Sequence, residues 1–253
     1  MRSIRAEDYQ NVPRRVAVMP KTFAAGSRTG RHFHPRAQLL YATAGLMMAT
    51  AQDGTWVVPE GHALWIPPRL PHAVVMHGAV SMCSAYLAAD AVSGFPTRAQ
   101  VIAVSPLLAA ALAALTGEPV LYDEAGRGGH LAALVLDEIA RAPETPLTLP
   151  LPDDLRLRRV CVGLIDDPAS PLDLDAWAWQ AGLSRRTLTR GFRQETGLSL
   201  GEWRARARVI RAMALAADGQ APRQVAAAVG YRSVQALRAR MDRVMPAARP
   251  AAD

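Results

Sequence analysis

Three histidines and a glutamine in the first third of the chain have the residue types and spacing of a polar binding site. His32 and His34 are two residues apart, and two such side chains point the same way when their segment is a β-strand. Gln38 follows four residues later, and His72 comes from a separate segment. Neutral imidazole and amide groups can ligate a divalent metal ion or anchor the polar part of an organic ligand. We therefore predict these four residues, with Trp65 as an aromatic wall, as ligand-binding residues.

A second set of residues suits the recognition of DNA. If 184–196 is a helix, Leu188 and Phe192 face inward while several arginines and Thr189 share the outer face. Such a face is often merely solvated, but arginine can also donate hydrogen bonds to base edges or phosphates. The predicted DNA-contacting residues are Arg185, Arg186, Thr189, Arg190, Arg193 and Arg204, with Gln235 and Arg238 from a later helix.

The elements expected to position these arginines form a helix-turn-helix. Asp173 is a good N-cap for a first helix, Gly182 is placed to end it, and Ser184 is an N-cap for the second helix. A helix with an arginine-rich outer face directly after a tight turn has the form that enters a DNA major groove.

A repeat strengthens this interpretation. The pattern Ala178-x-x-x-Gly182 returns as Ala226-x-x-x-Gly230, and Ser233 follows as the next N-cap. Residues 200–216, rich in alanine and arginine, are predicted to be the helix that connects the two units. The C-terminal part is therefore predicted to be all-α with two helix-turn-helix units.

At these positions the sequence resembles the AraC/XylS family of transcription regulators. The resemblance implies an effector-controlled regulator in which Arg186, Thr189 and Arg190 meet base edges and the other arginines meet phosphates. Met241 departs from the family's phenylalanine, and Pro246 is expected to end the last helix early, so the second unit is expected to bind DNA less strongly. The matching residues are Ala178, Gly182, Ser184, Leu188, Arg190, Phe192, Thr196, Gly197, Val225, Ala226, Gly230, Tyr231, Ser233 and Leu237.

The N-terminal part has the pattern of a β-barrel or sandwich. Short apolar runs at 39–42, 56–58, 63–66 and 73–76 are separated by glycine and proline turns. Within them, the spacing of two motifs resembles that of a cupin, the barrel that AraC-like regulators commonly use as an effector sensor. The matching residues are Gly26, His32, His34, Gln38 and Gly45, then Gly61, Pro67 and His72.

In metal-binding cupins the positions of the three histidines and Gln38 ligate a divalent ion. Here Gln38 replaces the acidic ligand and Arg69 replaces a glycine, so an added cation is expected beside the site. We therefore predict an organic effector and no metal or other cofactor. Two alternatives stay open: a metal-responsive regulator, and an enzyme of the metal-dependent cupin oxygenase or isomerase type.

Two helices, at 106–116 and 129–141, follow the strands, and they are predicted either to mediate dimerisation or only to cover the barrel. Four prolines then mark a semi-rigid linker. The fold class is thus α+β with two domains: a cupin-like sensor at 1–142, a linker at 143–152 and a DNA-binding domain at 153–253.

Charge and cysteine usage agree with this division. The net charge is +7, but residues 156–253 hold 17 arginines, no lysine and 9 acidic residues, whereas the rest is close to neutral. Cys83 and Cys161 form no CxxC pair, and no signal peptide is visible, so a cytoplasmic protein is expected. The expected partners are double-stranded DNA, a small-molecule effector, a second copy in a homodimer and, for an activator, RNA polymerase. No membrane partner and no enzymatic activity are expected.

Overall fold

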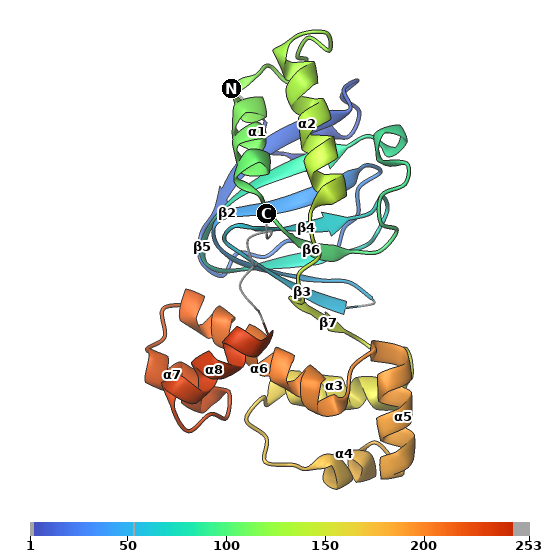
Figure 1. The fold of residues 1–253 in the computed structure, drawn as a ribbon, viewed down its shortest axis with the longest axis vertical. Coiled ribbons are helices and arrows are strands. Elements are labelled where there is room, and N and C mark those ends of the chain that lie inside the picture. Colours follow the sequence, from blue (N-terminus) through green and yellow to red (C-terminus); the bar gives the residue numbers. More distant parts are fainter. Residues whose placement is uncertain (1–2, 53, 245–253) are drawn as a thin grey trace, which may run out of the picture. The chain divides into compact units, whose positions relative to one another are not determined.

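The computed structural model describes residues 3–52 and 54–244, which divide into two compact units. One unit comprises the chain up to Ala51 together with Trp56–Thr145. The other comprises the short stretch between them and the chain from Pro146 onward. Sheet structure is concentrated in the first unit and helices in the second, which confirms the predicted α+β class (Figure 1).

The first unit is an antiparallel sheet with two helices packed on one face (Figure 1). Strands β1, β5, β2 and β3 are neighbours in that order, and β4 pairs with both β2 and β6. The elements are η1 (Ala6–Tyr9), β1 (Val16–Phe23), β2 (Ala37–Thr50), β3 (Gly54–Pro59), β4 (His62–Ile66), β5 (Ala73–Leu87), η2 (Ala89–Val92), β6 (Gln100–Ala103), α1 (Pro106–Gly117) and α2 (Arg127–Arg141).

The alternation of side chains along these strands produces two different buried faces. On β2, Leu39 belongs to the core that packs against α1 and α2, whereas Gln38 and Leu40 line a cavity on the opposite face. On β1, Val18 belongs to the helix-side core and Met19 to the cavity. The position of a residue in this alternation therefore decides whether it can contribute to the cavity.

Local sequence signals place the two covering helices. Ser105 accepts a hydrogen bond at its Oγ from the backbone N–H of Leu108, at 2.9 Å, and Pro106 occupies the first helical turn. The predicted helix at 106–116 is therefore present as α1. The second predicted helix, 129–141, is present as α2 and begins two residues earlier.

The second unit is helical, as predicted (Figure 1). Its core includes Phe192 and Trp203, both fully buried, whose rings meet edge to face with centroids 6.0 Å apart. Its elements are β7 (Thr148–Pro150), α3 (Leu155–Asp166), α4 (Leu174–Gln180), α5 (Arg185–Thr196), α6 (Leu200–Ala217), α7 (Pro222–Ala228) and α8 (Val234–Val244).

The proline-rich segment 143–152 is held by hydrogen bonds at each end. The backbone N–H of Thr145 donates to the carbonyl of Val101 at 2.7 Å, within the first unit. The Trp203 indole N–H donates to the carbonyl of Pro150 at 2.8 Å, within the second unit.

Pro246, expected to end the last helix, lies outside the described residues. Among the helices that the structure describes, none combines the length and apolar character that crossing a bilayer requires.

Candidate functional site

Helix α5 is fixed by its cap and by its buried face. The Ser184 Oγ accepts a hydrogen bond from the backbone N–H of Thr187 at 3.1 Å, as expected for an N-cap. Leu188 and Phe192 are fully buried beneath the helix. Gly197 ends α5 with φ of 72°, a left-handed conformation that glycine adopts without a steric penalty. The outer face of α5 is thus presented from a rigid base.

The outer face of α5 carries the predicted DNA-contacting side chains together. Arg185 forms an ion pair with Asp175 of α4, at 2.9 Å between nitrogen and oxygen. Thr189 donates its hydroxyl hydrogen to the Arg185 carbonyl at 2.8 Å, so its methyl group remains available to a ligand. The six residues along one exposed hollow of this helix are Arg185, Arg186, Thr189, Arg190, Arg193 and Gln194.

Arg204, predicted to contact phosphate, has a different role in the structure. Its guanidinium donates to the carbonyls of Leu172, at 3.2 Å, and of Ser170, both in the loop that precedes α4. Burial lowers the pKa of Arg204, and the side chain is half-buried on α6. Both terminal nitrogens of the guanidinium thus donate to backbone carbonyls, which gives Arg204 a structural role beside the phosphate contact that the sequence predicted. Arg208, one helical turn further along α6, makes the same kind of contact, because it donates to the Pro168 carbonyl at 2.7 Å. This i, i+4 pair of arginines is the feature of the sequence that could have indicated a structural role.

The second helix-turn-helix unit is formed by α7 and α8. Ser233 caps α8, because its Oγ accepts a hydrogen bond from the backbone N–H of Ala236 at 3.1 Å. Gln235 and Arg238 are exposed on this helix. Met241, which stands where a phenylalanine was expected, is half-buried against the cluster that contains Leu237.

The three predicted histidines form one cluster in the first unit. The ring centroids of His32 and His72 are 4.5 Å apart, those of His32 and His34 are 4.9 Å apart, and those of His34 and His72 are 5.7 Å apart. One potential ligand nitrogen from each ring lies within 4.8 Å of the others. Gln38 lines the same cavity. Four of the five predicted ligand-binding residues are therefore brought together.

Hydrogen bonds orient the side chains of this cluster. The Nδ1 atom of His32 is 2.7 Å from the Gly30 carbonyl oxygen, and the Nδ1 atom of His72 is 2.9 Å from that of Leu70. The Gln38 side-chain amide donates to the Ser84 Oγ at 3.1 Å. Ser84 was not predicted as a site residue. It lies two residues before Tyr86 on β5, so the two side chains share one face of the sheet, and this spacing could have identified it.

Burial favours the uncharged form of two imidazoles of the cluster, those of His34 and His72. Burial, followed by the neighbouring His32 and His72 rings, lowers the pKa of His34 from 6.5 to about 4. Burial also lowers the pKa of His72, although its hydrogen bond to the Leu70 carbonyl acts in the opposite direction. The Tyr86 ring lies edge-on to His34 with centroids 5.1 Å apart, and burial raises the pKa of its hydroxyl. At neutral pH the imidazoles of His34 and His72 are therefore mainly uncharged.

Trp65, the fifth predicted residue, does not line the cavity. It pairs with Leu39 in the β2–β4 register, and both side chains belong to the helix-side core. Its indole N–H donates to the Pro96 carbonyl at 2.8 Å, and its ring packs on Phe95. The predicted ligand-binding role is therefore wrong, because the residue lies on the other face of the sheet.

Arg69 does not bring its charge to the cavity either. Its side chain is exposed, and it is absent from the described residues that line the cavity. Its backbone has φ of 64°, and its N–H donates to the His34 carbonyl at 2.8 Å. The expected contribution of Arg69 to the site is thus not met, although the cavity does have a cationic side chain in its lining, that of Lys21.

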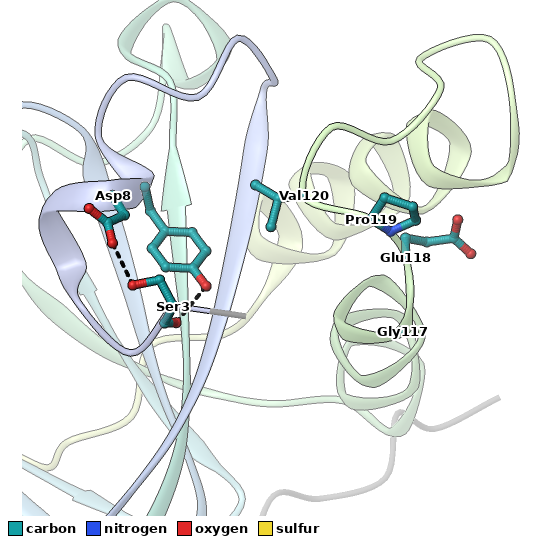
Figure 2. Close-up of a pocket in the computed structure, with 7 residues that line it drawn as sticks. Ser3, Asp8, Gly117, Glu118, Pro119 and Val120 are labelled. Carbon is teal, nitrogen blue, oxygen red and sulfur yellow. Dashed lines mark hydrogen bonds between the residues drawn. The ribbon is translucent and has the colours of Figure 1, made fainter. Parts of the chain in front are cut away.

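A separate hollow of about 510 Å³ lies between the N-terminal segment and the turn after α1 (Figure 2). Ser3 donates its hydroxyl hydrogen to Asp8 at 2.5 Å, and Tyr9 donates to the Ser3 carbonyl at 2.7 Å. Glu118 forms an ion pair with Arg127. The polar side chains of this hollow are thus paired with partners within the chain, and none of the predicted site residues lines it.

Comparison with known proteins supports both halves of this description. Residues 23–136 match the family model of the AraC-like ligand binding domain, and residues 177–247 match that of a helix-turn-helix domain. The chain is 27% identical over 206 residues to the HTH-type transcriptional regulator NimR of Escherichia coli, which covers 81% of this chain and 75% of NimR. It is 39% identical over 90 residues to the regulator RipA of Corynebacterium glutamicum, covering 36% of this chain and 27% of RipA.

Among solved structures, ToxT from Vibrio cholerae is similar over 92% of this chain and 95% of its own, with a TM-score of 0.38 and 8% identity. The two matched family models together span most of the chain, and they coincide with the unit that holds the histidine cavity and the unit that holds the arginine-bearing helix. The chain belongs to the AraC family of transcription regulators, with an N-terminal ligand-binding domain followed by a helix-turn-helix DNA-binding domain.

Proposed function

We propose that the protein controls transcription by reading a DNA site mainly through α5. The observation that carries this proposal is the exposed arginine face of α5 above the buried Leu188 and Phe192. Among the described residues, no carboxylate lies within ion-pair distance of Arg186 or Arg190, so both guanidinium groups are available to bases. Arginine in this position favours guanine, because it can donate two hydrogen bonds to one guanine edge.

The neighbouring side chains on α5 suit other parts of a DNA duplex. The Thr189 hydroxyl hydrogen is used within the helix, so its methyl group is placed to contact the methyl group of a thymine. Arg185 and Arg193 are assigned to phosphates, which fix the register of the protein without choosing a sequence. Gln235 and Arg238 on α8 are assigned to base edges in a neighbouring part of the major groove, as weaker contacts than those of α5.

We also propose that the regulator acts as a homodimer in the cytoplasm and that a ligand controls its DNA binding from the first unit. Two copies would place their helix-turn-helix units in successive major grooves, as repeated half-sites require. The outer faces of α1 and α2, on which Leu107 is half exposed, are the proposed dimer contact. The proposed ligand residues are His32, His34, Gln38 and His72, and RNA polymerase is a further partner if the protein activates transcription.

The test begins with the binding site, which can be isolated as the genomic fragments that the purified full chain retains. Arg190→Ala should then cost about 1–3 kcal/mol at that site and much less on random DNA, if Arg190 contacts one base through two hydrogen bonds. Arg193→Ala should weaken both kinds of binding to a similar degree. Arg98→Ala, which removes the same charge from an exposed position of the first unit outside α1 and α2, is the matched control.

The proposal fails if the full chain retains no fragment above random DNA. The base-contact assignment alone fails if Arg190→Ala reduces binding to the selected site and to random DNA by the same factor.

A further inference from the structure

The helical unit contains a pocket of its own, which none of the predicted ligand-binding residues lines. It lies where α4, α5 and the beginning of α6 meet, and its volume is about 270 Å³. Pockets for organic ligands commonly have about 300–1,000 Å³, so this one suits a small molecule. Most of its wall is apolar and consists of the Trp177 ring with the side chains of Leu172, Leu174 and Leu200.

The Trp177 indole N–H is a buried donor at this pocket. The side chain has an exposed fraction of only 7%, and no acceptor among the described residues lies within hydrogen-bond distance of its Nε1 atom. The far edge of the ring faces α3, where a Cβ on Gly163 would come to 2.7 Å from the ring carbon Cη2. The nitrogen edge of the ring is therefore directed away from α3, on the side where the ring lines the pocket.

Arg204 brings a second donor of the same kind to the pocket. Its terminal nitrogens donate to the carbonyls of Leu172 and Ser170, whereas its Nε atom is buried and has no partner among the described residues. The positive charge of Arg204 is thus met by carbonyl oxygens and not by a carboxylate. Buried donors without partners are uncommon unless water or a ligand satisfies them. Two of them at one pocket call for an acceptor that the described chain does not supply.

The charges around the pocket select the kind of acceptor. Gly201 lines the pocket from the first turn of α6, where the N–H groups of a helix lack intrahelical partners and the helix dipole favours an anion. The carboxylate of Asp173 also lies in the lining, but it accepts the capping hydrogen bond from the backbone N–H of Ala176 at 2.9 Å. Together with the Arg204 guanidinium, this arrangement suits a ligand with a single negative charge.

We propose that this pocket binds a small organic monoanion, which consists of an apolar body and one carboxylate. The carboxylate oxygens accept hydrogen bonds from Trp177 Nε1 and Arg204 Nε, and the apolar body packs against the leucine side chains. A phosphate group, free or from DNA, matches the donors less well, because the apolar wall would leave several of its oxygens without a partner.

Thr189 connects the pocket with the predicted DNA-contacting face of α5. It lines the pocket, and it also lies along the exposed hollow that contains Arg186 and Arg190. A bound carboxylate would occupy space beside α5 and neutralise the charge of Arg204. We therefore expect the ligand to lower the affinity for DNA. This consequence rests on the proposed DNA-binding function, whereas the binding of the ligand does not.

The experiment titrates the full chain with phenylacetate, an aromatic monocarboxylate, and follows the indole N–H signals in ¹H–¹⁵N spectra. The Trp177 signal is identified by its loss in Trp177→Phe. A hydrogen bond to a carboxylate should move its proton signal to higher frequency, with a Kd of about 1 mM or lower, as is usual for so small a ligand. The Trp203 signal is the internal control, because its N–H already donates to the Pro150 carbonyl.

Two variants and two analogues test the assigned contacts. Trp177→Phe should weaken binding by about 3–10-fold, the value of one hydrogen bond, whereas Trp179→Phe, at an exposed position of the same helix, should leave it unchanged. Gly201→Leu should abolish binding, since its Cβ meets open space and the added side chain would fill the pocket without disturbing the fold. Phenylacetamide, which lacks the charge, should bind at least about 5-fold more weakly, and phenethylamine should not bind.

Several results would overturn the site. They are a Trp177 signal that stays in place up to about 10 mM phenylacetate, and binding that is unchanged in both Trp177→Phe and Gly201→Leu. A Trp177 signal that moves in the same way when the selected DNA is added alone would assign the pocket to a DNA phosphate, and it would overturn the organic ligand.

The effect on DNA binding has its own measurement. Affinity for the selected DNA fragment is compared with and without saturating phenylacetate, and we expect a decrease of at least about 5-fold, the lower end of ordinary coupling between two sites. In Gly201→Leu the same comparison should show no decrease. An unchanged affinity in the parent protein, or an equal decrease in Gly201→Leu, would overturn this control of DNA binding. The DNA-binding function itself stands or falls separately, through the test of Arg190.

Discussion

Replacement of Arg204 by alanine distinguishes a structural arginine from one that binds DNA. Arg204 on α6 donates to two backbone carbonyls, those of Ser170 and Leu172, which lie in the loop between α3 and α4. Hydrogen bonds from a charged donor contribute about 1.5–3 kcal/mol each to stability. The loss on replacement by alanine is smaller than the sum of the two, because water can then donate hydrogen bonds to the two carbonyls. We expect Arg204→Ala to lower the free energy of unfolding of the second unit by about 2–3 kcal/mol.

This loss is large enough to measure in the full chain. In a domain of this size, 1 kcal/mol corresponds to a shift of about 4–8 °C in Tm, so scanning calorimetry should show a decrease of about 10–20 °C. Arg211→Ala, at an exposed position of the same helix, is the control for charge and helix propensity, and its Tm should change little.

DNA binding of the same variants completes the comparison. At a temperature well below the transition, Arg204→Ala should leave the salt dependence of DNA affinity unchanged. Arg193→Ala should instead reduce the slope of log affinity against log salt by about 0.9, the value for one lost phosphate contact. The structural role of Arg204 would be refuted if its replacement left Tm within experimental error of the parent and reduced the slope as Arg193→Ala does.

Two further predictions concern the helix-turn-helix units. Gly182 and Gly230 both have positive φ, but a Cβ at Gly182 meets open space, whereas one at Gly230 comes to 3.0 Å from a backbone Cα. In urea unfolding, Gly182→Ala should therefore cost about 1–2 kcal/mol and Gly230→Ala about 1–3 kcal/mol more, and equal losses would contradict this reasoning. Gln235→Ala and Arg238→Ala should each reduce affinity for the selected DNA less than Arg190→Ala does, and footprinting of the two halves of the site would reveal the opposite order.

The helical unit could be predicted because its signals are local. Asp173, Ser184 and Ser233 each cap the helix that follows them, and Gly182 and Gly230 each adopt the left-handed conformation that ends a helix. A cap needs only residues within one turn, so the sequence contains all the information that it requires. The spacing of the arginines then places their side chains on the outer face of α5 without further knowledge of the fold.

The ligand-binding unit could be predicted only in part, because its geometry depends on pairing between distant strands. The spacing of His32 and His34 predicted a common direction, and the resemblance to a cupin supplied His72. Trp65 was misplaced because its side of the sheet follows from its pairing with Leu39, and register between strands is not encoded within either strand alone.

Arg204 shows a related limit in the helical unit. A single sequence reveals that an arginine lies on a helix, but not which carbonyls of a distant loop approach its donors. The half-buried position of Arg204 depends on the path of the loop at 167–173, where Ser170 is itself buried. The sequence therefore predicted that the Arg204 guanidinium faces solvent and DNA, whereas in the fold it donates hydrogen bonds to backbone carbonyls.

Arg69 shows why a substitution within a motif has to be judged by the backbone as well as by the side chain. In the resembling family this position is a glycine, and Arg69 keeps the left-handed conformation that a glycine would adopt, with φ of 64°. Its N–H can therefore still donate to the His34 carbonyl, which holds the second motif against the first. The gained guanidinium points to solvent instead of the cavity, so it carries no information about the charge of the ligand. The chemistry of the site depends instead on Gln38, whose unpaired oxygen lies in the cavity that the three histidines also line.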